Sequence, residues 1–217
     1  MIGILLQLLQ SLPMTALLWF AAQVLGLLLA VPIAACRMSR NRWLRTIAVW
    51  YIEIFRGIPT LVLLFIVFFG LSSAGFNLTS VIASILALGV SASAYQAESI
   101  RSGFEAVPIQ QYEAAIALSL PRGIRLSKVL LPQAMPVVLE GLVAFSIQML
   151  KETALASLLG VAEVMSIAYY LVQRGVDGTI VFAITGLLYL ILCVLLAGIA
   201  GLIGRRAGTS GKKAKVA

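Results

Sequence analysis

The stretch from Leu12 to Cys36 reads LPMTALLWFAAQVLGLLLAVPIAAC and contains no charged residue. A helix of about 20 apolar residues crosses the hydrocarbon core of a bilayer, so this stretch is long enough to span a membrane. The whole chain has the same character: 61% of its 217 residues are hydrophobic, 11% are charged, and the mean hydropathy is +1.06. A soluble domain of this size needs more charge to cover its surface. The composition therefore predicts a membrane protein.

Four further apolar runs follow the first one. They cover Ile47–Leu71, Leu78–Arg101, Val137–Leu159 and Thr179–Ile203. The polar stretches between these runs are too short for a second folded domain. The sequence therefore predicts an all-α membrane protein, in which residues 1–217 form a single transmembrane domain with five membrane-spanning helices.

The positive charge of the chain is unevenly distributed, with a net charge of +8. Basic residues gather between the first two runs (Arg37, Arg40, Arg42, Arg45), at or beyond the end of the third (Arg101, Arg122, Arg125, Lys128) and after the fifth (Arg205, Arg206, Lys212, Lys213, Lys215). Segments rich in Lys and Arg stay on the cytoplasmic side of a membrane. The N-terminus is therefore predicted outside and the C-terminus inside. We expect the positive charge to face anionic lipid headgroups rather than nucleic acid.

Several kinds of chemistry have no support in this sequence, which contains no histidine and no GxxxxGK[ST] motif. The missing histidine excludes Ser-His and Cys-His nucleophile pairs and the His-based metalloprotease sites. GxxxxGK[ST] is the phosphate-binding loop of P-loop ATPases, so its absence excludes an ATP site of that kind. Cys36 and Cys193 lie far apart in or beside apolar runs, and we interpret both as packing residues. No catalytic residue, metal site or cofactor is predicted.

The segment between the third and fourth runs, residues 105–134, is polar. From position 109 it reads IQQYEAAIALSLPRGIRLSKVLLPQA. Good helix formers open this segment, and Pro121 and Gly123 then interrupt the helix. Two short helices with a bend are predicted on the cytoplasmic side. They form a projection that a partner protein can contact.

This segment resembles the EAA loop of the permease subunits of bacterial ATP-binding-cassette (ABC) importers. In that family Glu-Ala-Ala is followed four residues later by glycine, and further on by a hydrophobic pair and proline. Glu113, Ala114, Ala115 and Pro132 match this pattern. Ser119 stands at the position of the glycine, so the sequence departs from the family in the turn that ends the first short helix.

Three other segments resemble signatures of one branch of that family, the polar amino acid permeases. They read YIEIFRGIPTLVLLF from position 51, SAYQAESIRSGFEAV from position 93 and KETALASLLG from position 151. The matches occur in the order found in the family and cover about half of the chain. The resemblance implies the type I ABC importer permease fold in the bacterial inner membrane.

The resemblance also implies an assembly and a function. The chain is expected to form a dimer with an identical or a related permease, to bind a dimer of ATPase subunits that carries the ATP, and to receive substrate from an external binding protein. It would translocate a polar amino acid by alternating access, coupled to the ATPase through the Glu113 loop. A permease for another solute, such as an osmolyte or methionine, is the first alternative. A membrane scaffold or an intramembrane enzyme is the second.

Charged and polar side chains inside the predicted spans are candidates for the substrate passage, because a charge in a bilayer needs a partner or a watery cavity. One group comprises Glu53, Arg56, Tyr95, Glu98 and Glu140, with Arg101 at the membrane boundary. Pairing of Arg56 with Glu98 or Glu140 would neutralise these charges within the protein. Contact with the substrate, the ATPase or the partner permease is the alternative.

A second group, Lys151, Glu152 and Thr153, interrupts the fourth apolar run. Its three side chains offer a cation for a substrate carboxylate, an anion for an ammonium group and a hydroxyl, at the depth where carriers hold their substrates. Neighbouring residues on a helix point about 100° apart, so one charge can face the passage while the other meets a neighbouring span. Pro59, in the second run, is expected either to open the passage by a kink or to bend the helix without a functional role.

Overall fold

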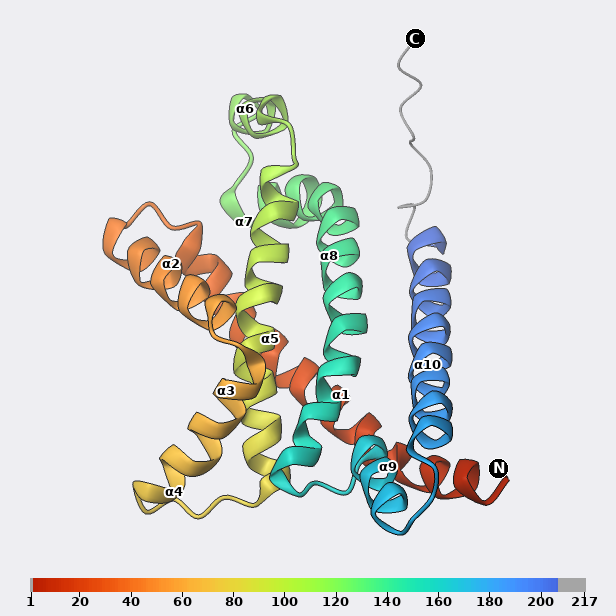
Figure 1. The fold of residues 1–217 in the computed structure, drawn as a ribbon. Coiled ribbons are helices and arrows are strands. Elements are labelled where there is room, and N and C mark those ends of the chain that lie inside the picture. Colours follow the sequence, from red (N-terminus) through yellow and green to blue (C-terminus); the bar gives the residue numbers. More distant parts are fainter. Residues whose placement is uncertain (1, 207–217) are drawn as a thin grey trace.

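The structure is a computed structural model that describes residues 2–206, and within this range every element is helical. In chain order the elements are α1 (Ile2–Arg37), α2 (Arg42–Gly57), α3 (Thr60–Phe65), η1 (Ile66–Gly70), α4 (Leu71–Ser73), α5 (Ser80–Glu105), α6 (Ile109–Ala117), α7 (Arg122–Ile124), η2 (Arg125–Leu130), α8 (Leu131–Glu152), η3 (Thr153–Leu159), α9 (Val164–Gln173) and α10 (Gly178–Arg206) (Figure 1). The predicted all-α fold is confirmed. Lys212, Lys213 and Lys215 lie outside the described residues.

The described helices provide four or five candidate membrane spans. Four are long and apolar enough by themselves: α1, α5, α10 and the continuous segment Arg122–Leu159 that contains α8. A fifth exists if α2 and the helix from Thr60 to Ser73 count as one bent span. The first turns of α1 lie at one end of the molecule, together with α4 and α9, whereas α6 and the last turns of α10 lie at the other end (Figure 1).

Helix α1 begins at Ile2, well before the span expected from Leu12. Its 36 residues correspond to about 54 Å of helix, more than the roughly 30 Å of a bilayer core, and it crosses obliquely behind α5 and α8 (Figure 1). The additional turns pack inside the protein, because Leu8 is fully buried in a cluster with Val164 of α9 and Val181 of α10.

Proline interrupts the second span. Helix α2 ends at Gly57, Pro59 precedes the first residue of α3, and the two helix axes meet at 102°. Proline has no backbone N–H to donate, and it disfavours helical geometry in the residue before it, here Ile58. The expected kink is therefore present as a sharp break between two helices.

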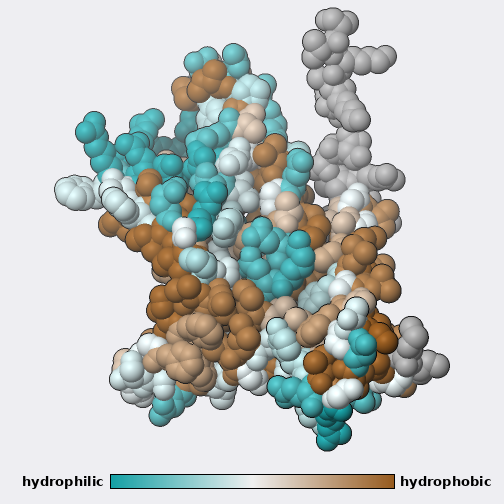
Figure 2. All heavy atoms as spheres, in the orientation of Figure 1, coloured by the Kyte–Doolittle hydropathy of each residue, from teal (hydrophilic) through white to brown (hydrophobic). Residues whose placement is uncertain are grey.

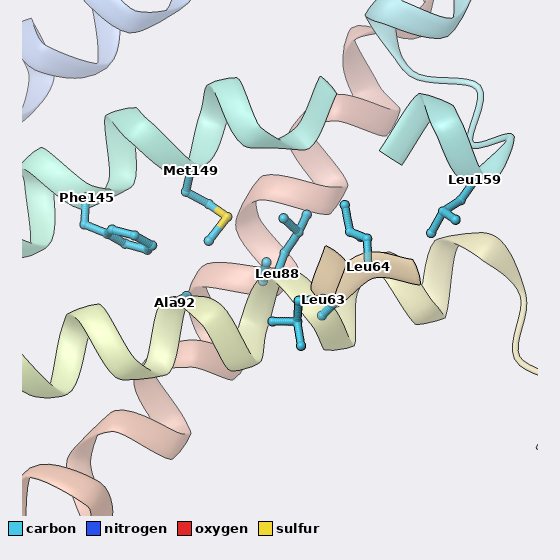
Figure 3. Packing of buried hydrophobic residues seen from close by; sticks show 9 residues of the cluster. Leu63, Leu64, Leu88, Ala92, Phe145, Met149 and Leu159 are labelled. Atoms are coloured by element: carbon cyan, nitrogen blue, oxygen red, sulfur yellow. The ribbon is translucent and has the colours of Figure 1, made fainter. Parts of the chain in front are cut away.

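The core lies where α1, α3, α5, α8 and η3 meet. Leu63, Leu64, Leu88, Ala92, Phe145, Met149 and Leu159 pack there together with Ala22 and Ala87 (Figure 3). Small residues bring α1 and α5 into close contact. A Cβ atom on Gly89 would lie 2.6 Å from Leu25 Cδ2, and one on Gly26 would lie 2.6 Å from Ala92 Cβ. Close packing of this kind is typical of helix pairs in membranes.

A buried carboxylate connects α9 to the bundle. Glu163 is fully buried and caps α9 by accepting a hydrogen bond from the backbone N–H of Ser166 at 2.8 Å. Its second oxygen accepts from the Tyr189 hydroxyl of α10 at 2.9 Å, and the hydroxyl of Thr15 in α1 accepts from the N–H of Val164 at 3.2 Å. Helix α9 is thereby fixed between α1 and α10.

Candidate functional site

Two helix breaks face each other across the core. Helix α8 ends at Glu152 and continues as the tighter helix η3, while α3 begins at Thr60 after the Pro59 break. The Glu152 carboxylate joins the two sites: it accepts from the Thr60 hydroxyl at 3.2 Å and from the Gln148 side-chain amide at 2.8 Å. Interrupted helices that meet at a charged side chain are a common design for a substrate site in a transporter.

A cavity of about 450 Å³ begins beside this pair of breaks. It is lined by Arg56, Tyr95, Glu98, Ser99, Ser102, Val137, Glu140, Gly141, Ala144, Phe145 and Gln148. These residues come from the last turn of α2 and from facing stretches of α5 and α8. Along α8 the lining runs from Gln148 to Val137, about 16 Å at 1.5 Å per residue, toward the end of the molecule that carries α6.

Aromatic rings position Arg56 in the cavity wall. Its guanidinium group lies 5.3 Å from the centre of the Tyr95 ring, within the range of a cation–π contact. The Tyr95 ring in turn stacks on Phe145 of α8, with 4.6 Å between the ring centres and 15° between their planes. The cavity therefore has an aromatic wall with one cation in front of it.

The predicted pairing of Arg56 with Glu98 or Glu140 is not found in the structure. Glu98 is instead bound by Arg101, one turn further along α5, whose Nε donates to Glu98 Oε2 at 3.0 Å. Arg101 also pairs with Glu105. Among the side chains of residues 3–202, these are the ion pairs within 4 Å. The pairing differs because residues three apart on one helix meet without bringing two helices together. Arg56 and Glu140 are thus left facing the cavity.

The other candidate residues lie apart from this cavity. Glu53 is exposed on α2 and is absent from the lining. Thr153 is fully buried, and its hydroxyl donates to the Leu150 carbonyl at 2.7 Å. Lys151 lines a separate cavity of about 380 Å³ between α8, α9 and α10, whereas its neighbour Glu152 contacts α3. The assignment of Glu53, Lys151 and Thr153 to the passage stays a prediction.

Four residues of this region were missed in the sequence. Thr60, Ser99, Ser102 and Gln148 carry small polar or amide groups, which occur in many membrane helices without any function. Gln148 alone had a usable signal, because it stands four residues before Glu152 and therefore on the same helix face.

Of the two short helices predicted between the third and fourth spans, the first is present as α6, whereas the second, α7 with η2, continues without a break into α8. Helix α6 is anchored on its inner side: Ala115 is buried, and the Tyr112 hydroxyl donates to the Phe104 carbonyl at 3.1 Å. Partial burial raises the pKa of the Tyr112 phenol, so the group stays neutral and able to donate. Glu113 and Ala114 are exposed.

The outer face of this projection is apolar around Glu113. Ile116 and Leu118 are 59% and 72% exposed, and Ile109 and Leu126 are exposed as well. A patch of large apolar side chains beside a carboxylate is typical of a surface that a partner protein covers.

Comparison with known proteins decides the family. The model of the binding-protein-dependent transport system inner membrane component matches residues 22–209, which include every residue that lines the cavity. The chain belongs to this family. The resemblance to permease subunits of ABC-type polar amino acid importers is confirmed, and so is the multi-pass location in the inner membrane.

Individual relatives cover nearly the whole permease. It is 33% identical over 199 residues to the arginine transport system permease protein ArtQ of Bacillus subtilis, with 91% of each chain covered. It is 32% identical over 186 residues to the putative glutamine transport system permease protein GlnP of Rickettsia felis, with 85% of each covered.

Two solved structures show the same architecture as the permease. The crystal structure of an amino acid ABC transporter with histidines superposes with a TM-score of 0.86 at 32% identity, covering 92% of the permease and 94% of that chain. An inward-facing structure of the MetNI methionine ABC transporter shares the fold, with a TM-score of 0.80 at 23% identity, over 93% of the permease and 96% of that chain.

The departure at Ser119 has a structural consequence for the permease. Ser119 has φ of 53°, in the left-handed region, where a side chain costs about 1–2 kcal/mol and glycine is favoured. Its N–H donates to the Ile116 carbonyl and that of Leu120 to the Ala115 carbonyl, at 2.8 and 3.2 Å. These two bonds form the motif that commonly ends a helix with glycine. The family's glycine therefore matches the backbone here.

We expect Ser119→Gly to stabilise the end of α6 by about 0.5–1 kcal/mol, because the strained conformation costs glycine nothing. Amide hydrogen exchange over residues 109–120 should slow by about two- to fivefold. The matched control is Ser127→Gly in η2, where φ is negative and glycine is expected to accelerate local exchange. Equal effects of the two variants would contradict this account of the turn.

Proposed function

We propose that the permease carries a polar amino acid across the inner membrane as the membrane-spanning subunit of an ATP-driven importer. The observation that supports this most is Glu152, a carboxylate placed at two facing helix breaks beside a cavity that carries Arg56. Relatives named for arginine and glutamine transport point to the same class of substrate.

Glu152, which is hydrogen-bonded to Gln148 at one end of the cavity, suits the ammonium group of an amino acid. Glu152 already accepts two hydrogen bonds, from Thr60 and Gln148, and a carboxylate has room for further donors. These two bonds fix the carboxylate before the substrate arrives, which lowers the cost of binding. Arg56 and Glu140 lie along the remaining path, where they supply charges of both signs to a solute that carries both.

The shape of the cavity corresponds to one state of an alternating-access cycle. Beyond Glu152 toward the α9 end, Leu159 of η3 belongs to the same core cluster as Leu63 and Leu64 of α3 (Figure 3). Toward the α6 end the cavity continues along α5 and α8. If the α6 end is cytoplasmic, as the basic residues predict, this state is open to the inside and closed to the outside.

The projection formed by α6 and α7 is proposed to receive the motion of a separate ATPase subunit. That subunit, as a dimer, would bind the ATP, so the assembled complex would be the enzyme and the permease would contain no ATPase site. A second permease, identical or related, and an external amino-acid-binding protein complete the assembly. The exposed residues Glu113, Ile116 and Leu118 support contact at this place, since α6 is held by its opposite face.

The test of the proposed function is uptake into proteoliposomes. The permease is reconstituted with its co-encoded ATPase and binding protein, and ATP-dependent accumulation is measured over a panel of amino acids, an osmolyte and methionine. Accumulation of a polar amino acid above the others is the expected result. Accumulation of only the osmolyte, or no association with any ATPase, would refute the proposal.

Loss of the Glu113 carboxylate tests the coupling. We expect Glu113→Gln to weaken binding of the ATPase about 10-fold or more, because a charge-assisted hydrogen bond contributes about 1.5–3 kcal/mol. Uptake per ATP hydrolysed should fall, while binding-protein contact on the other side is unaffected. Asp177→Asn is the matched control: it removes one exposed carboxylate at the α9 end and keeps the cap of α10 through its oxygen. Equal coupling in both variants would remove Glu113 from this role.

A further inference from the structure

Helix α2 has two different faces. Its inner face carries the buried residues Ala48 and Ile52, and the hydroxyl groups of Tyr51 and Ser93 hydrogen-bond at 2.7 Å. Its outer face carries a stripe of exposed large side chains at helical spacing: Trp43, Ile47, Trp50 and Ile54. Trp43 is 80% exposed and Trp50 is 65% exposed. Such a stripe on a monomeric surface needs an apolar environment.

Four arginines surround the start of this stripe. Arg37 ends α1, Arg40 lies in the turn, and Arg42 and Arg45 belong to the first turn of α2. The last three are exposed. The ion pairs among the side chains of residues 3–202 involve none of these four. In Figure 2, hydrophilic side chains gather where α1 meets α2, directly beside hydrophobic surface.

We propose that this elbow of α1 and α2 binds anionic phospholipid headgroups of the membrane leaflet, with Trp43 and Trp50 inserted at the level where headgroups meet acyl chains. Tryptophan is enriched at that level because its ring is apolar and its N–H is polar. Arginines just beyond it meet phosphate groups, which their planar guanidinium groups bind with two hydrogen bonds.

The direction of the stripe favours lipid over a protein partner. From Ile54 the exposed apolar surface continues beyond the break onto α3 and η1, through Val62, Phe65, Ile66 and Phe69. These side chains belong to the bent pair of helices that forms a candidate span. A surface that is continuous with a membrane-facing helix and ends in a ring of arginines matches the boundary of a bilayer.

Lipid bound at this elbow would act on the transport cavity through a rigid connection. Arg56 lies in the last turn of the same helix, and it lines the cavity. The orientation of α2 therefore determines where the Arg56 guanidinium group lies in the cavity wall. The binding proposal itself does not depend on the substrate or on transport.

The test uses the tryptophans as reporters. The chain has three tryptophans, and Trp19 lies in the core, where it donates to the Ser146 carbonyl. The variant Trp19→Phe removes this internal fluorophore, so that the signal comes from Trp43 and Trp50 alone. The purified variant is placed in nanodiscs that contain phosphatidylcholine or phosphatidylglycerol brominated near the headgroup end of the acyl chains. We expect strong quenching, with a preference for phosphatidylglycerol of about fivefold for each arginine that contacts a headgroup.

Charge variants separate the site from general electrostatics. Arg42→Gln with Arg45→Gln should lower the preference at least about fivefold, and Arg42→Lys with Arg45→Lys should restore most of it. Arg122→Gln with Arg125→Gln removes the same charge on the same side of the protein and should leave the preference unchanged. If Trp19→Phe lowers stability, Trp43→Phe and Trp50→Phe are made in the native background instead. The quenching that each of these variants loses then reports the contact of that tryptophan with lipid.

Three outcomes would overturn the proposal. Equal quenching by both lipids would mean a membrane contact without selectivity for anions. Absence of quenching by either lipid would place the tryptophans against protein, such as an acidic surface of the ATPase. Equal loss of preference in the two Arg→Gln pairs would show that total charge, rather than this elbow, attracts the lipid.

Discussion

Glu152→Gln is expected to lower the rate of amino acid uptake by about 10- to 100-fold at low substrate concentration, because a hydrogen bond to a charged partner contributes about 1.5–3 kcal/mol. The amide also brings an N–H₂ group against one of the two donors, because Thr60 and Gln148 donate to different oxygens of the present carboxylate. The substrate ammonium then loses its anion, and the site loses its fixed geometry. Initial rates in proteoliposomes with the ATPase and the binding protein measure this effect.

Glu53→Gln is the control for this prediction. It removes the same charge from the exposed side of α2, away from the cavity lining, and uptake should stay within about twofold of the parent. Thermal unfolding of both variants checks that the fold is intact. A Glu152→Gln permease with unchanged rate and unchanged KM would mean that Glu152 only joins α3 to α8. A large loss with Glu53→Gln would place that residue in the passage after all.

Gly103→Ala is expected to destabilise the bundle by about 2 kcal/mol, because an added methyl group in a filled contact costs about 1–3 kcal/mol. Gly103 lies where α5 crosses α8. A Cβ atom there would overlap the Val138 side chain and approach the Ala134 carbonyl oxygen to 2.9 Å. That oxygen belongs to the backbone and cannot rotate away, so the two helices must separate. Unfolding of the purified permease in detergent measures the loss.

A control and a rescue test the cause of this loss. Gly198→Ala in α10 meets nothing within 4 Å, and should be neutral or stabilising by up to about 1 kcal/mol, since alanine is the better helix former. Combining Gly103→Ala with Val138→Ala removes part of the overlap. The double variant should therefore lose less stability than the sum of the losses of the two single variants. Full additivity, or a stable Gly103→Ala permease, would contradict the close crossing described here.

The class of fold and the projection were predictable because both depend on local composition. Apolar runs of sufficient length can satisfy their backbone in a bilayer only as helices, and the structure is helical throughout residues 2–206. The bend in the polar segment was predictable from Pro121, which stands directly before α7, whereas the turn itself is formed at Ser119 and Gly123 lies within α7. The first turns of α1 were less predictable, because their place depends on Leu8 packing against α9 and α10.

The candidate site was predictable only in part. Its charged residues could be named because charges are rare and costly inside a membrane. The partners of these charged residues could not be named from the sequence, since Arg56 contacts Tyr95 rather than a carboxylate and Glu98 is bound within its own helix. Which side of α8 each residue of the Lys151–Glu152 pair faces also depended on how α8 packs between α3 and α10.

The sequence by itself determined a chain of membrane helices, the place of its protruding loop and the family to which it belongs. These properties depend on hydropathy, proline and short motifs, which act over a few residues. Tertiary structure alone decided that Thr60 of α3 donates to Glu152 of α8 across two facing breaks, and that one face of α2 packs against α1 and α5 while its tryptophan stripe stays exposed. The physical reason is that such contacts join residues far apart in the chain, and their geometry depends on how whole helices cross.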